Sequence, residues 1–148
     1  MPDMTVDNEM SIRRLEYIYR QKEGLNNRSF AIFAFFQSIF TLGVGAVAFL
    51  IRDAKSFNPG TFRILLESVG VAVFVAGILS TILLVSGLVA WGRYGEDERQ
   101  LLGKEGEVPS FSFKACWGWF ETYLILAIFL AALGFWCFAH KLSDLPLP

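Results

Sequence analysis

Three long runs without an ionisable side chain constrain this chain more than any other feature of its sequence. Residues 29–51 and 68–92 carry no charge, and residues 122–139 form a third such run. An α-helix rises about 1.5 Å per residue, so about 20 apolar residues cross the roughly 30 Å hydrocarbon core of a bilayer. The first two runs exceed that length and the third comes close to it. The sequence therefore predicts an all-α integral membrane protein with three transmembrane helices.

Aromatic residues support the third span. Trp117, Trp119 and Tyr123 lie at its start and Trp136 lies near its end, as expected where membrane helices meet the lipid headgroups. The composition agrees, because 54% of the residues are hydrophobic, against about 45–50% in soluble domains. The predicted spans are residues 29–51, 68–92 and 118–139, within a transmembrane domain of residues 29–148.

The polar segments are short. Residues 1–28 predict a short amphipathic cytoplasmic helix and a linker: apolar side chains recur on one side of a helix over residues 8–23, and Gly24 is expected to end it. Such a helix rests on the membrane interface, or forms a collar that contacts lipid, a partner or other copies of the chain. Residues 93–114 are expected to form a short polar connector.

The distribution of basic residues predicts the orientation. Nine of the 13 Lys and Arg residues precede the first run or lie between the second and third, and the other four flank the opposite ends. Cytoplasmic flanks carry the excess of positive charge in membrane proteins. We therefore expect the N-terminus in the cytoplasm and the C-terminus outside.

Small and polar residues recur every three or four positions within each run. In a bilayer, close approach of backbones at such residues brings helices together, because lipid tails are as apolar as the helices. The spacing predicts one helix-packing face in each span. These faces comprise Ala34, Ser38, Thr41 and Gly45 in the first span, Gly70, Gly77, Ser80 and Gly87 in the second, and Ala127, Ala131 and Gly134 in the third.

The spacing leaves open whether these faces meet within one chain or between chains. Within one chain, the three faces close a single bundle. Between chains, one face lines a subunit interface or a narrow pore, and Gln37 then faces the axis or a neighbouring chain, because an unpaired amide is costly in the membrane. In both cases Phe33, Phe36 and Phe40 lie away from the first packing face, where side chains that face lipid or form an outer layer are expected.

Gln37 and Glu121 are the candidate intramembrane polar residues. Glu121 lies early in the third span, where an acid is a functional candidate. The alternative is an interfacial side chain that reaches water or pairs with Arg93 or Lys114. His140 is the single histidine and adjoins Lys141 at the outer edge, so we expect that one chain assembles neither a His-based metal cluster nor a Ser-His-acid triad. The sequence predicts no catalytic, cofactor-binding or metal site, and we expect a protein that is not an enzyme.

The segment "RRLEYIYRQKEGLNNRSFAIFAFFQ", residues 13–37, places a cytoplasmic helix directly before a membrane span. In this layout the chain resembles the small transmembrane effectors of bacterial anti-phage systems, such as the SLATT-type and Pycsar-type proteins. The resemblance covers at most the first two spans, and the third span departs from it. It implies a pore-forming effector in a bacterial inner (plasma) membrane.

Three functional classes follow from these features. We expect an accessory subunit whose packing faces join it to a homo- or hetero-oligomeric membrane assembly, with the lipid bilayer and other copies or a larger complex as partners. The alternatives are a small oligomeric channel or pore-forming effector, and an ion-coupled carrier that uses Glu121. Nucleic acid is not an expected partner, because the formal net charge is -1 and the basic residues form no run.

The orientation is tested by labelling single cysteines in a background in which Cys116 and Cys137 are replaced by serine. A cysteine introduced within residues 56–61 should react with an impermeant maleimide on intact cells, because this loop is expected outside. A cysteine within residues 96–100 should react only after permeabilisation. The opposite pattern would contradict the orientation.

Overall fold

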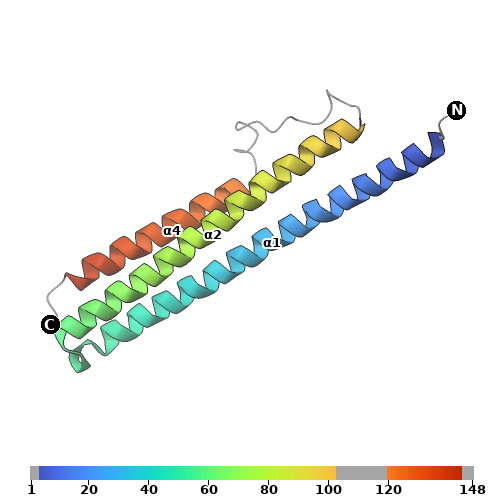
Figure 1. Cartoon of the computed structure of the whole chain (residues 1–148). Helices are drawn as coiled ribbons and strands as arrows, with labels where there is room; N and C mark the ends of the chain where they lie inside the picture. The colour runs from blue at the N-terminus through green and yellow to red at the C-terminus, as the bar shows by residue number, and fades with distance from the viewer. Residues whose placement is uncertain (1–3, 103–119, 145–148) are drawn as a thin grey trace.

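The computed structural model describes residues 4–102 and 120–144, and these residues form three long α-helices. In chain order they are α1 (Met4–Arg52), α2 (Pro59–Leu102) and α4 (Phe120–Ser143), with one short 3₁₀ turn, η1 (Ala54–Ser56), between α1 and α2. Figure 1 shows α1 and α2 as a long antiparallel pair, with α4 beside α2. All three helices are long and apolar enough to cross a membrane. The chain is an all-α, multi-pass membrane protein, as its sequence predicts.

α1 is one continuous helix of 49 residues, so the predicted break at Gly24 is wrong. A glycine inside a helix costs about 1 kcal/mol relative to alanine, which is too little to end a helix whose backbone hydrogen bonds continue on both sides. Contacts between α1 and α2 on the N-terminal side of Gly24 further hold it in place. α1 is therefore about 74 Å long, more than twice the thickness of the hydrocarbon core.

α2 also extends beyond its apolar run. Residues 93–102 continue the helix, where the sequence predicts a polar connector; the remainder of that connector and the first part of the third predicted span, residues 103–119, lie outside the described residues. Figure 1 shows α1 and α2 continuing together past the start of α4. We call this extension, residues 10–28 of α1 and 93–102 of α2, the stalk.

A tight turn joins α1 and α2 at the other end of the bundle, which we call the hairpin end. Pro59 begins α2, and proline is well placed there because the first helical N–H groups have no partner within the helix. The backbone N–H of Phe62 donates to the carbonyl oxygen of Asn58 at 3.0 Å, which closes the first turn.

α2 lies between its two neighbours and packs against both of them. The buried side chains form one cluster toward the hairpin end and a second toward the stalk. The first cluster comprises Val47, Leu50, Phe62, Leu66, Val73 and Phe135, and the second comprises Phe36, Leu84, Leu124, Ile128 and Ala132. Lipid also solvates apolar side chains, so these clusters stabilise the bundle through close contact rather than through removal from water.

The small residues of α2 face inward. Gly70, Gly77 and Ser80 are buried and Gly87 is half-buried. A Cβ at Gly70 would lie 3.0 Å from the Cβ of Ala139, and one at Gly77 would overlap the Cβ of Ala132. The missing side chains on α2 thus let α4 approach its backbone closely, and this face packs within the chain.

α1 turns Phe33, Phe36 and Phe40 toward the other helices, so the prediction that Phe36 faces lipid or lies in an outer layer is wrong. Phe36 is buried, and Phe33 and Phe40 are half-buried against the same core. The physical reason lies in α2: the space left by Gly77 is bordered by the ring of Phe36, 3.3 Å from where a Cβ would stand. A large ring on one helix fills the gap beside a glycine on the next, as close packing requires.

α4 presents a face that is rotated from the predicted one by about one residue. Ala127 and Gly134 are exposed and Ala131 is half-buried. The buried residues are Leu124, Ile128, Ala132, Phe135, Ala139 and Ser143. The spacing is the same, but each residue turns a helix by about 100°, so the contact runs along the neighbouring row of side chains, where Phe135 packs against Phe40 with ring centroids 5.4 Å apart.

The contact at Gly77 predicts a sharp difference between two equivalent substitutions in α2. Gly77→Ala must displace Ala132, whereas a Cβ at Gly87 meets no atom within 4 Å. Both changes gain the same helix propensity, so their difference isolates the contact. Overpacking of this kind costs about 1–3 kcal/mol, and thermal unfolding in mild detergent should show a lower midpoint for Gly77→Ala than for Gly87→Ala. Equal midpoints would show that the α2–α4 contact is not tight.

Candidate functional site

A buried polar junction ties the stalk together where it meets the membrane-spanning part. The ammonium of Lys22 on α1 donates to the carboxylate of Glu98 on α2, and the hydroxyl of Tyr19 donates to the same carboxylate at 3.0 Å. Lys22 Nζ also lies 4.8 Å from the ring centroid of Trp91. The side chains of Lys22 and Glu98 are only 15% and 11% exposed. We call these four residues the stalk junction.

The hydrogen bonds of the stalk junction keep Glu98 ionised. Glu98 lies beyond the apolar run of α2, and the hydrogen bond from Lys22 lowers its pKa, against the opposing effect of burial. A carboxylate whose pKa is lowered on folding stabilises the fold above its unfolded-state pKa, and this contribution is lost as the pH falls through the lowered value. The junction is therefore formed at neutral pH and weakens on acidification.

A pocket of about 580 Å³ lies beside the stalk junction. All three helices contribute to its walls, because α4 begins at this level. The lining residues with polar or aromatic side chains include Lys22, Glu23, Asn26, Trp91, Phe120 and Glu121. Within the described residues, neither Glu23 nor Glu121 has a hydrogen bond or an ion pair. The pocket thus combines an aromatic wall with two carboxylates that have no partner in the described part of the chain.

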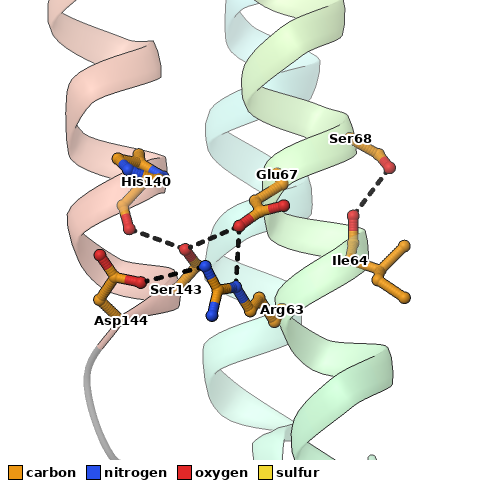
Figure 2. Close-up of polar contacts among 7 residues, drawn as sticks. All are labelled: Arg63, Ile64, Glu67, Ser68, His140, Ser143 and Asp144. Carbon is orange, nitrogen blue, oxygen red and sulfur yellow. Dashed lines mark hydrogen bonds and ion pairs between the residues drawn. The ribbon is translucent and has the colours of Figure 1, made fainter.

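A second polar cluster joins α2 and α4 at the hairpin end (Figure 2). Arg63 donates through Nε to Glu67 at 2.9 Å and forms an ion pair with Asp144 at 3.4 Å. The Ser143 hydroxyl lies 2.7 Å from the carbonyl oxygen of His140 and 3.4 Å from Glu67. The hydrogen bond from Arg63 lowers the pKa of Glu67. Arg63 and Asp144 are exposed, so their ion pairs contribute little to stability, but the cluster as a whole joins α4 to α2.

The predicted packing face of α1 lies on the outside of the bundle that the described residues form. Ala34, Gln37, Ser38, Thr41 and Gly45 are all exposed, and we call them the α1 outer face. Ser38 bonds back to the carbonyl oxygen of Ala34 at 2.9 Å, and a Cβ at Gly45 would meet no atom within 4 Å. The side-chain amide of Gln37 has no hydrogen-bond partner in the part of the chain that the structure describes.

Of the two cations expected as partners of Glu121, only Arg93 lies in the described part of the chain. Glu121 is half-buried on the pocket wall and forms no ion pair with Arg93, whose side chain is exposed beside Val89 and Ala90. Lys114, the other expected partner, lies outside the described residues. Glu121 is thus placed at a pocket that the sequence does not reveal.

Sequence periodicity also misses the stalk junction, because Lys22 and Glu98 are 76 residues apart. One signal could have found the pair. Lys22 precedes the first apolar run by about two helical turns, and Glu98 follows the second by nearly the same distance. Two antiparallel helices of a hairpin bring such equidistant residues to the same level.

No family model, curated protein or solved structure matches this chain. The packing faces, the stalk junction and the pocket are therefore the features from which its function is inferred. Of these, the α1 outer face lies inside the apolar run of α1, and the pocket lies at the edge of that run.

The stalk junction should contribute far more stability than an exposed ion pair of the same helix. Glu98→Gln leaves Lys22 buried beside a neutral partner, and the loss of a hydrogen bond to a buried charge costs about 1–3 kcal/mol. The control is Glu16→Gln, which breaks a pair with Arg20 whose side chains are 60% and 75% exposed and should change stability by less than about 0.5 kcal/mol. Chemical unfolding in detergent measures both. Similar losses for the two variants would contradict a buried junction.

Proposed function

We propose that this chain is a non-enzymatic membrane subunit that assembles with further copies of itself through the α1 outer face. One observation carries the proposal. Gln37, an amide inside the apolar run of α1, is exposed and unpaired within the described chain. A primary amide without a hydrogen-bond partner in an apolar medium is destabilised by about 2–7 kcal/mol.

A second copy of the chain satisfies this amide best. Glutamine carries both a donor and an acceptor, so the same residue on a symmetry-related helix is a complementary partner. The neighbouring small side chains, Ala34, Ser38, Thr41 and Gly45, are exposed and recur at steps of three and four. They allow the second backbone to approach closely enough for dispersion contact along the helix.

The stalk offers further surface for an assembly. Three apolar side chains of α1 in the stalk are exposed: Met10 at 55%, Ile12 at 58% and Tyr17 at 57%. Large apolar side chains outside the hydrocarbon core favour a covering partner. We place the stalk in the cytoplasm of a bacterial cell, with α4 ending outside the inner membrane, because the basic residues concentrate on the stalk side of the spans.

A small oligomeric channel is the second candidate function. Gln37, Ser38 and Thr41 bring an amide and two hydroxyl groups to one exposed face of α1, and such groups line narrow polar pores. In this arrangement several copies surround an axis and Gln37 faces water instead of a single neighbour. The resemblance to pore-forming effectors of anti-phage systems points in the same direction.

The assembly is tested by two matched glycine substitutions and by Gln37→Leu. A Cβ at Gly45 or at Gly134 meets no atom of the described residues within 4 Å, so Gly45→Ile and Gly134→Ile should fold equally well. Gly45→Ile should shift the protein from oligomer to monomer in light-scattering chromatography in mild detergent, because its branched side chain separates the paired helices. Gln37→Leu should weaken association several-fold, and Gly134→Ile should leave it unchanged.

A wild-type protein that is monomeric at all concentrations, or a Gly45→Ile variant that associates like the wild type, would contradict the proposal. Conductance across planar bilayers separates the two candidate functions. Oligomers without conductance support the accessory subunit. A conductance that Gln37→Leu abolishes supports the channel.

A further inference from the structure

The pocket beside the stalk junction carries more negative than positive charge. Lys22 lines it, but Glu98 neutralises this lysine through their ion pair. Glu23 and Glu121 line the same pocket and have no ion pair among the described residues. Two carboxylates that no described cation neutralises, at one partly enclosed site, favour a cationic occupant, because each would gain from an opposite charge where water is partly excluded.

The remaining walls fit an organic cation rather than a metal ion. Trp91, Phe120 and Leu88 supply apolar and aromatic surface, which attracts ammonium groups and their carbon substituents. Calcium or magnesium would require six or more oxygen ligands in a compact shell. The pocket volume of about 580 Å³ lies within the range of roughly 300–1,000 Å³ that is typical of organic-ligand sites.

The depth of the pocket in the membrane further narrows the class of ligand that it can bind. Its walls come from Asn26 and Ser29 at the start of the first apolar run, Leu88 and Trp91 at the end of the second, and Phe120 at the start of α4. Tryptophan and charged side chains at such positions lie at the level of the lipid headgroups. An occupant at this level meets water on one side and hydrocarbon on the other.

We propose that this pocket binds an ammonium group carried on an apolar or amphiphilic body. Glu23 and Glu121 neutralise the ammonium, and Trp91 and Phe120 pack against its carbon atoms. The headgroup of phosphatidylethanolamine and a free organic amine share this chemistry. The site is separate from the α1 outer face and extends the function beyond assembly.

The test uses the full-length protein in a nonionic detergent and measures lipid adducts by native mass spectrometry. Phosphatidylethanolamine and phosphatidylglycerol with the same acyl chains are titrated in parallel, because they differ in the ammonium group. Phosphatidylethanolamine should bind about tenfold more tightly, and Glu121→Gln and Glu23→Gln should each remove most of this preference. Glu16→Gln, an exposed stalk carboxylate outside the pocket, should retain it.

Competition with ethanolamine and tetramethylammonium identifies the source of the ammonium. If millimolar free amine displaces the lipid, the pocket recognises the amine alone. If the lipid resists displacement, the pocket recognises the whole lipid headgroup. Both outcomes support the site. Equal binding of the two lipids, or a preference that survives both Glu23→Gln and Glu121→Gln, would overturn it. Glu23 is exposed, so its variant keeps the test decisive even where Glu121→Gln unfolds the protein.

Discussion

The close approach of α2 to α4 and α1 at its small residues is the contact on which the rest of the structure depends. Hydrocarbon surrounds the bundle, so burial of apolar surface contributes little to helix association, and dispersion contact at short backbone separation must supply it. Gly70 and Gly77 provide that separation against Ala139 and Ala132. The same gap beside Gly77 receives Phe36 of α1, so one helix sets the position of both neighbours.

This packing of α2 against its two neighbours determines which surfaces of the bundle remain exposed. Because α1 turns Phe33, Phe36 and Phe40 toward the other helices, the α1 outer face is left on the outside of the described bundle. The stalk junction then fixes α1 and α2 to each other beyond the membrane, through a lysine and a carboxylate that are nearly buried. Where α4 begins beside this junction, the three helices leave the pocket that contains Glu121.

Much of this fold follows from the sequence, and the failures have identifiable causes. Charge-free runs reveal spans because the hydrocarbon core excludes charge, and the small-residue period reveals the inward face of α2. For α1 the same period identifies a row of small and polar residues. It does not predict whether that row contacts the same chain or another one, and the structure leaves Gly45 exposed. The inward position of Phe36 depends on the gap at Gly77, and the Lys22–Glu98 pair depends on hairpin geometry; neither is local in sequence.

The central claim is that the α1 outer face contacts a second copy of the chain. Disulfide cross-linking within native membranes tests this claim most directly. The background is a variant with Cys116 and Cys137 replaced by alanine. One single cysteine replaces Thr41. The control replaces Leu79, which is 55% exposed on the lipid side of α2. The account predicts that a mild oxidant converts Thr41→Cys to a covalent dimer and leaves Leu79→Cys monomeric. Equal cross-linking at both positions, or none at Thr41, would contradict it.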